Sequence, residues 1–266
     1  MTHDPLAARL QSHLPHSARV WGYLLGGKEN YPADREVGDM IVQMFPGIAT
    51  LARMQRYFLA RAVRFLAGEA GIRQFLDIGT GLPTSDNTHE VAQRVAPESR
   101  IVYVDNDPLV LLHAQALLTS SPEGACAYVE ADVRDPDAIL HEAARTLDFG
   151  KPVALTMLGI MGQLHDSEDP WSITARLLDA LPSGSYLALC DGTDTNEALN
   201  QAIATYNANS ASSYHLRSPE QVTRFFDGLD LLDPGVVPIA LWRPDVIDFD
   251  ETPPPADAYA AVARKP

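Results

Sequence analysis

The side chains best placed to do chemistry are carboxylates that lie in or just after short apolar runs. Asp77 lies in the run QFLDI, directly before the turn GTG at 79–81. Asp105 closes the run RIVYVD, and Asp132 follows ACAYVEA. The glycines permit a tight turn that lets backbone N–H groups approach a ligand. A carboxylate in the position of Asp105 accepts hydrogen bonds from two ribose hydroxyls. These residues predict a nucleotide-type site.

The elements that must position these carboxylates alternate between strand and helix patterns. Five such units in succession predict a doubly wound, mostly parallel α/β sheet with helices on both faces, and two final strands bring the sheet to seven. In such a sheet the ligand lies beyond the carboxyl ends of the strands, where the strand order reverses. We expect strands at 74–78, 100–107, 125–133, 152–158 and 185–191, then in LDLLDPGVVPIALWRPD and AYAAVARKP, and helices near 86–96, 108–118, 136–147, 171–181, 195–208 and 218–227.

Before the first strand, the sequence predicts a helical lid at residues 1–70, ahead of a ligand-binding core at 71–266. The first 18 residues are polar and read as a mobile tail. Residues 18–36, ARVWGYLLGGKENYPADRE, interleave aromatic and hydrogen-bonding side chains around two glycines. We expect this stretch to fold over the strand ends and to enclose ligands with Arg19, Tyr23, Asn30, Tyr31 and Arg35.

A second helix follows Pro46–Gly47. Its arginines, at positions 53, 56, 61 and 64, form a basic face. Such a face could meet an acidic partner, but a solvated face is the favoured interpretation.

The amino-acid composition limits the classes of protein to which this chain can belong. The chain has 266 residues, 46% of them hydrophobic, and a formal net charge of −15, which is typical of a soluble globular protein and disfavours nucleic acids or anionic membranes as partners. No apolar leader is apparent, and no apolar run is long enough to span a membrane. Cys126 and Cys190 lie in strand patterns, so we expect buried free thiols and a reducing, cytoplasmic location.

Two kinds of nucleotide ligand compete for the glycine turn. A nicotinamide-dependent oxidoreductase would carry G-x-G-x-x-G, whose third glycine allows close packing of helix and strand. Here the series reads GTGLPT, so Thr84 replaces that glycine and Pro83 precedes it. An adenosine ligand without a pyrophosphate fits better, with Asp105 at the ribose and Asp132 and the Val133 backbone at the adenine. Acidic residues would also favour a sulfonium and an ammonium group.

These same segments resemble a known family. FLDIGTGLP, VYVDNDP and ADVRDP are similar to the first three motifs of class I S-adenosylmethionine-dependent methyltransferases. A closer resemblance, from about residue 15 to the C-terminus, is to the branch known only as S-adenosyl methyltransferase. It is carried by ARVWGYLLGGKENYPADRE, FLDIGTGLPT with NTHEVAQ, VYVDNDPLV, GSYLAL and WRPD. The resemblance implies a Rossmann-like methyltransferase fold, S-adenosyl-L-methionine as cofactor and a small-molecule acceptor.

The resemblance also implies roles for matching positions. Gly79, Thr80 and Gly81 would approach the methionine part of the cofactor, with Asp77 orienting the turn or reaching the amino group. Asp105 and Asn106 would hold the ribose, and Asp132 and Val133 would face the adenine. Leu158 and Gly159 would close the pocket.

No general base stands out in the sequence. Members of the branch carry a Leu-His pair near the fourth strand, but here Gly162 takes the position of that histidine. His165 and His89 are weaker candidates. No cluster has the spacing of a metal site. The missing histidine leaves a non-catalytic S-adenosylmethionine-binding sensor or partner protein as the alternative to an enzyme, with the oxidoreductase third.

Overall fold

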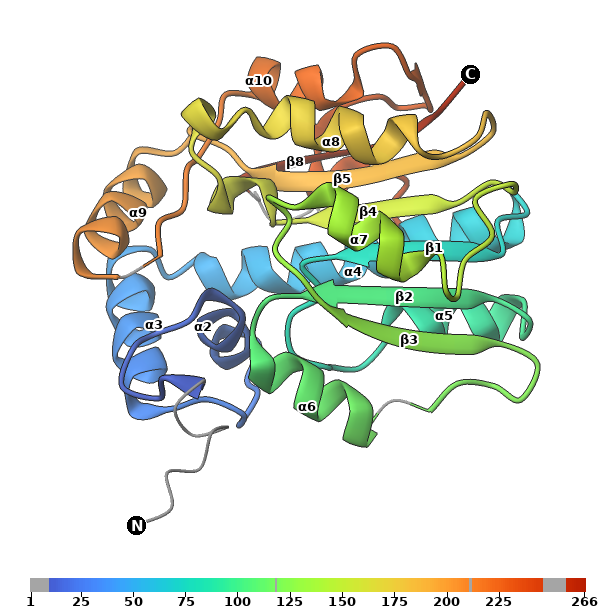
Figure 1. Ribbon diagram of the computed structural model, residues 1–266. Helices are drawn as coiled ribbons and strands as arrows, with labels where there is room; N and C mark the ends of the chain where they lie inside the picture. The colour runs from blue at the N-terminus through green and yellow to red at the C-terminus, as the bar shows by residue number, and fades with distance from the viewer. Residues whose placement is uncertain (1–9, 118, 211, 246–256) are drawn as a thin grey trace.

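A central sheet with helices on both faces carries the site (Figure 1). The computed structural model describes residues 10–117, 119–210, 212–245 and 257–266. Five strands run parallel in the order β3-β2-β1-β4-β5, and β8 pairs with β5 in the antiparallel sense. Their bounds are β1 Gln74–Ile78, β2 Arg100–Asp105, β3 Ala125–Glu130, β4 Ala154–Leu158, β5 Tyr186–Gly192 and β8 Ala258–Arg264. The predicted fold class, a doubly wound α/β sheet, is confirmed.

The edge of the sheet beyond β8 differs from the prediction. The segment LDLLDPGVVPIALWRPD forms two separate two-residue strands, β6 Asp230–Leu231 and β7 Val237–Pro238, which pair with different parts of β8. The described sheet therefore has eight strands, where seven were predicted. Pro234 and Gly235 lie between the two pieces, and proline has no N–H with which to continue a ladder.

Two hydrophobic layers cover the faces of the sheet. Helix α4 (Ile48–Gly68) buries one stripe, including Leu51, Phe58 and Leu66, against the layer that also contains part of α5 (Thr88–Val95). Such a stripe is the pattern of an amphipathic helix packed on a core. The other layer receives α7 (Pro136–Ala143), α8 (Pro170–Asp179), and α10 (Pro219–Thr223) with η3 (Arg224–Phe226). Helix α6 (Pro108–Leu117) contacts β2 and β3.

Three further helices lie beyond the carboxyl ends of the parallel strands: α2 (Ser17–Leu24), α3 (Pro32–Met44) and α9 (Glu197–Asn209), here called the lid helices (Figure 1). Helix α3 contacts both α2 and α9. Because α4 packs against the sheet, α2 and α3 are the helices of the described part of the predicted 1–70 segment that occupy this position, and α9 joins them from beyond β5. Residues 1–9 of the predicted tail lie outside the described residues, and Ser17, at its end, begins α2.

A buried ion pair connects the lid helices to the core. The Arg19 Nε of α2 lies 3.0 Å from Asp107 Oδ2, after β2, and Arg19 Nη1 lies 3.9 Å from Asp34 Oδ2 of α3. His16 Nδ1 lies 3.1 Å from the same Asp107 oxygen. Since Arg19 and both carboxylates are almost fully buried, these contacts fix α2 and α3 over the end of β2.

Short helical turns follow β4. They are η1 (Met161–Gln163) and η2 (Asp166–Glu168), and η4 (Ile239–Leu241) follows β7. No described helix has the length and apolar character needed to cross a membrane.

Candidate functional site

A cavity of about 460 Å³ lies between the strand ends and the lid helices. Its lining joins the ends of β1, β2 and β4 to side chains of the lid helices and α4. The ten residues predicted to bind a cofactor all line it, and they are Asp77, Gly79, Thr80, Gly81, Asp105, Asn106, Asp132, Val133, Leu158 and Gly159.

The glycine turn after β1 is fixed by β2. The N–H groups of Gly79 and Thr80 both donate to the Val104 carbonyl, at 2.8 and 3.2 Å. Gly79 has a φ of +72°, and a Cβ there would lie 2.8 Å from the Ile160 side chain. Only glycine fits both conditions, because other residues rarely adopt positive φ and would also need space that Ile160 occupies. The turn thus keeps its backbone open to the cavity.

Asp105 is held by backbone donors from both sides. Gly81 N–H donates to its Oδ2 at 2.8 Å, and Asp107 N–H donates to its Oδ1 at 2.9 Å. Burial raises the pKa of this carboxyl, while the two N–H donors and nearby His16 lower it in part. Each oxygen keeps a second lone pair, so the carboxylate is oriented and can accept two further hydrogen bonds.

Asp77 faces the cavity from within β1 but is tied on both oxygens. It accepts hydrogen bonds from the hydroxyls of Thr88, at 2.6 Å, and Thr156, at 2.9 Å. Burial raises its pKa, which the two hydroxyls and the charge of Arg56 oppose. These contacts tie Asp77 to α5 and β4, and each oxygen keeps a second lone pair for a ligand, so the two predicted roles stay predictions.

Arg56, on α4, was not predicted as a site residue. Its Nη2 donates to the carbonyls of Ser85 and Asp86, at 3.1 and 3.0 Å, and its side chain lines the cavity. Burial lowers its pKa, and the nearby carboxylate of Asp77 opposes that shift.

The predicted solvated face of α4 is therefore only partly present. Arg61 is also turned inward, onto the Trp242 and Ile239 carbonyls at 3.0 and 2.9 Å. Arg53 and Arg64 stay on the surface. The sequence shows only four arginines along one helix, so it could not reveal that Arg56 and Arg61 point inward.

Asp132 lies at the end of the cavity formed by the loop after β3. Its Oδ2 accepts a hydrogen bond from the Asn106 side chain at 3.2 Å, and its Oδ1 accepts one from Arg134 N–H at 2.9 Å. Val133 beside it is buried. Asp132 and Val133 thus provide a carboxylate and an apolar side chain in the same part of the cavity as Asp105, the arrangement that the sequence predicted for an adenosine.

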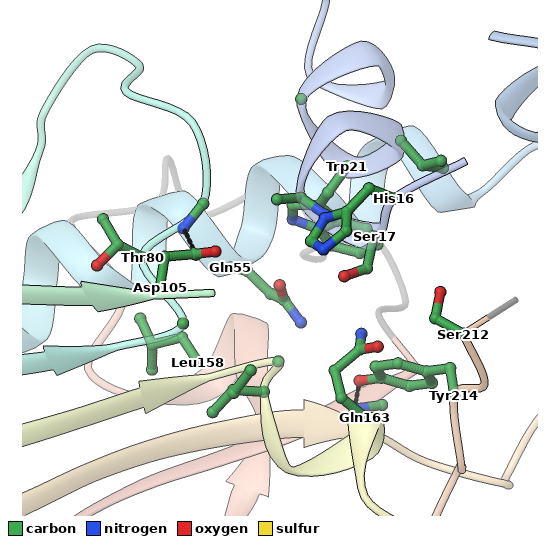
Figure 2. A pocket seen from close by; sticks show the side chains of 18 of the residues that line it. His16, Ser17, Trp21, Gln55, Thr80, Asp105, Leu158, Gln163, Ser212 and Tyr214 are labelled. Carbon is green, nitrogen blue, oxygen red and sulfur yellow. Dashed lines mark hydrogen bonds between the residues drawn. The ribbon is translucent and has the colours of Figure 1, made fainter. Parts of the chain in front are cut away.

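The rest of the cavity, here called the distal half, is lined by α4, α9 and the segment 212–216. Figure 2 labels Gln55, Gln163, Ser212 and Tyr214 of this half. Its side chains are mostly apolar, and its polar groups are amides and hydroxyls. They are Ile41, Ile48, Leu51, Gln55, Leu59, Gln163, Leu199, Ile203, Tyr206, Ser212, Ser213, Tyr214 and Leu216. One sequence feature could have indicated this wall, the spacing of Leu199, Ile203 and Tyr206 on a single helix face.

The five residues predicted to enclose ligands lie outside this lining. The positions of α2 that do line the cavity include Ser17, Val20 and Trp21, so Arg19 lies on another face of the helix, in its buried ion pairs. Tyr23 donates to Asp39 at 2.6 Å, Arg35 bonds the Asn30 side chain at 2.8 Å, and Tyr31 caps α3. In the structure these five residues connect α2, α3 and the loop between them.

The two histidines proposed as bases also lie outside the lining. His89 is buried on α5, with its Nδ1 2.8 Å from the Tyr103 hydroxyl, and burial lowers its pKa. His165 caps η2, with its Nδ1 2.8 Å from Ser167 Oγ and its ring edge-on to His215. Within the described part of the chain, no three His, Cys, Asp or Glu residues gather as a metal site would require. Cys126 and Cys190 are free thiols, as predicted, but only Cys190 is buried, and Cys126 is half-buried.

Comparison with solved structures shows the same fold over the whole chain. A DUF574 family protein from Streptomyces avermitilis is 48% identical, with a TM-score of 0.93, covering 97% of this chain and 100% of that one. A candidate methyltransferase from Thermobifida fusca is 42% identical, with a TM-score of 0.88, covering 100% and 99%. A more distant S-adenosylmethionine-dependent methyltransferase from Anabaena variabilis, 13% identical with a TM-score of 0.51 over 76% of this chain and 80% of that one, shares the fold.

Sequence comparison gives the family directly. A search of curated proteins gave no match. Residues 3–266 match the family described as S-adenosyl methyltransferase, which is nearly the whole chain and includes every residue of the cavity. The chain belongs to the S-adenosyl methyltransferase family.

Proposed function

We propose that this protein transfers the methyl group of S-adenosyl-L-methionine to a small-molecule acceptor. The observation that carries the proposal is one continuous cavity, with the ten predicted cofactor residues at one end and the uncharged distal half at the other. Its volume of about 460 Å³ lies within the roughly 300–1,000 Å³ usual for small-molecule sites.

The residues at the first end fit the cofactor part by part. The oriented carboxylate of Asp105 can accept both ribose hydroxyls, and Asp132 with Val133 suits the adenine edge. The open turn at 79–81 lets the methionine chain approach the backbone. We assign the methionine carboxylate to Arg56, whose cationic group lines the cavity near Asp77.

Methyl transfer from a sulfonium is an in-line displacement, so the protein accelerates it chiefly by alignment. Walls from α4 and α9 would hold the acceptor's body, and Gln55, Gln163 and Ser212 would orient its polar group (Figure 2). The bound cofactor supplies the reactive methyl group. The protein positions the two reactants and excludes water from the cavity.

A non-catalytic role as an S-adenosylmethionine-binding sensor or partner protein is the second candidate. It is favoured by one observation, that neither His89 nor His165 lines the cavity. Binding of the cofactor without turnover on any of a broad set of acceptors would support it, and methyl transfer at a useful rate would exclude it.

Calorimetry with S-adenosylmethionine, S-adenosylhomocysteine and NAD tests the cofactor directly. We expect the first two to bind, and Asp105→Ala to weaken both by about 10- to 100-fold, the cost of losing hydrogen bonds to a charged group. Asp137→Ala, which removes an exposed carboxylate paired with Arg176, is the control. Binding of NAD alone, or an unchanged affinity in Asp105→Ala, would overturn the proposal.

A further inference from the structure

The distal half contains a tyrosine bonded to a buried carboxylate. The Tyr214 hydroxyl donates to Asp191 Oδ1, at the end of β5. Asp191 is 1% exposed and does not line the cavity, whereas Tyr214 does. In Figure 2 the Tyr214 hydroxyl lies beside Gln163, whose amide points into the cavity. A polar group of the cavity is thus connected to a buried carboxylate behind its wall.

Backbone donors hold that carboxylate in place. Gly162 N–H donates to Asp191 Oδ2 at 2.7 Å, and Gly192 N–H donates to Oδ1 at 3.0 Å. Gly192 N–H also lies 3.3 Å from the Tyr214 oxygen. A phenol oxygen has two lone pairs, so one stays available for a hydrogen bond from a molecule in the cavity.

The ring of Tyr214 occupies the space that a side chain at position 162 would need. A Cβ on Gly162 would overlap the Tyr214 ring atoms. Gly162 and Tyr214 therefore depend on each other, since the tyrosine reaches Asp191 only because residue 162 has no side chain.

We propose that Tyr214 is the general base of the methyl transfer, passing the acceptor's proton to Asp191, and that the acceptor is an uncharged, largely apolar molecule with a hydroxyl group. This inference rests on the proposed function. The acceptor's O–H bond breaks as its oxygen forms a bond to the methyl carbon, and the carbon–sulfur bond breaks, leaving a neutral thioether. The acceptor's proton goes to the Tyr214 oxygen, and the Tyr214 proton goes to Asp191. Asp191 becomes neutral as the sulfonium charge disappears, so charge balances.

The lining of the distal half selects this acceptor class. A hydroxyl keeps its proton at neutral pH, so its methylation benefits from a base. An acceptor carboxylate needs no base and would be repelled by Asp191. A protonated amine would need direct contact with a carboxylate, but Asp191 does not line the cavity. Apolar walls such as Leu51 and Ile203 favour an apolar body.

The charges around the pair agree with this role. Burial raises the pKa of Asp191, while the Tyr214 and backbone donors and the nearby Arg217 guanidinium lower it in part. Burial and the Asp191 charge raise the pKa of Tyr214 well above its ordinary value, with a smaller contribution from Cys190. Tyr214 therefore stays protonated at neutral pH and acts by passing a proton on, while Asp191 must be ionised to receive it.

The test uses methyl-labelled S-adenosylmethionine with 2-naphthol, which is apolar and carries one hydroxyl, and with 2-naphthoate as a matched charged probe. We expect methylation of 2-naphthol only, and a loss of about 100-fold or more in kcat in Tyr214→Phe, the usual range for a general base. Phenylalanine keeps the ring beside Gly162, so binding of S-adenosylhomocysteine is expected to stay unchanged. Tyr186→Phe, at the opposite end of β5, is the matched control.

The pH profile separates proton transfer from a structural role. In the wild type, the rate falls as pH drops through the raised pKa of Asp191, because a protonated carboxyl cannot accept the proton. In Tyr214→Phe that limb is lost, and the rate instead rises with pH as 2-naphthol ionises. In Gly162→Ala the ring is displaced, so adding Tyr214→Phe has little further effect.

Each result bears on the inference in a different way. Cofactor binding with equal kcat in the wild type and Tyr214→Phe would overturn the role of Tyr214 and leave the proposed function standing. Methylation of 2-naphthoate, or none of 2-naphthol by a chain that binds the cofactor, would overturn the acceptor class. No cofactor binding at all would overturn the proposed function itself.

Discussion

Gly81 and Asp105 are joined by a 2.8 Å hydrogen bond from the backbone N–H of the turn to the carboxylate at the end of β2. The bond connects the two elements that would contact the methionine part and the ribose of one cofactor. A displacement of the turn would therefore move the carboxylate as well. The turn and Asp105 form one preorganised unit, which lowers the entropic cost of binding.

Gly79→Ala tests how tightly that turn is constrained. The positive φ and the close Ile160 side chain predict a loss of about 1–3 kcal/mol of folding stability, the usual cost of a non-glycine residue in this region. Urea unfolding measures it. Gly68→Ala, at the end of α4 with ordinary space around it, is the control and is expected to change stability by less than about 1 kcal/mol. Equal stabilities would show that the turn is free to relax.

Arg56→Met tests the assignment of the methionine carboxylate. We expect the affinity for S-adenosylmethionine to fall by about 10- to 100-fold, because a charge-assisted hydrogen bond is lost. The affinity for 5′-methylthioadenosine, which has no carboxylate, should be unchanged. Arg53→Met removes an exposed arginine of the same helix and serves as the control. A parallel loss for both ligands would contradict the assignment.

Arg19→Met tests the anchor between the lid helices and the core. Removing this cation takes the arginine from two buried carboxylates, Asp34 and Asp107, and leaves His16 as the remaining basic neighbour of Asp107, which predicts a loss of about 3–5 kcal/mol in folding stability. Urea unfolding is again the measurement. Arg64→Met breaks the exposed pair with Asp245, where about 0–1 kcal/mol is expected. Similar losses in the two variants would refute the anchor.

The affinity for S-adenosylmethionine should depend on pH through Asp105. Burial raises the pKa of this carboxyl, and only its ionised form can accept both ribose hydroxyls. Affinity should therefore fall as pH drops through a pKa above the ordinary Asp value. Nearby His16 lowers the pKa of this carboxyl in part, and the charge of Asp107 raises it. Calorimetry from neutral to acidic pH measures the effect, and Asp105→Asn should remove it.

The stability of the unliganded protein should change with pH in the opposite direction. The folded-state pKa values of Asp77, Asp105 and Asp191 are all raised by burial, so folding favours their protonated forms. Their contribution is fully present below the ordinary Asp pKa and is lost as pH rises through the raised values. Comparing the unfolding free energies of Asp191→Asn and the wild type across that range isolates one of the three contributions.

The sheet and the cofactor end of the cavity could be predicted because they depend on local patterns. Apolar runs identify strands, and parallel strands bring their carboxyl ends together, so Asp77, Asp105 and Asp132 had to meet. The last edge could not be predicted in detail, because Pro234 and Gly235 divide one apolar segment into two short strands.

The acceptor side depends on contacts between distant segments, which no local pattern reveals. Aromatic and polar side chains in 18–36 predicted a site, but the rotation of α2 turns Arg19 away from the cavity and Trp21 into it. Tyr214 reaches Asp191 through the space left by Gly162. In the sequence, that glycine could be read only as a missing histidine.

The lid helices are attached to the core with unequal strength. Helix α2 is held by the fully buried Arg19–Asp107 ion pair, whereas α9 is held by its contact with α3 and by half-buried hydrogen bonds from Asn196 to Asp257 and between Asn207 and Tyr214. Local unfolding occurs most often in the helix that is held less strongly, which is α9. Its backbone amides should therefore exchange hydrogen faster than those of α2. The distal half would then open while the cofactor end stays closed. Product and acceptor could exchange past α9 without the cofactor leaving, which corresponds to an ordered kinetic sequence in which the cofactor binds first.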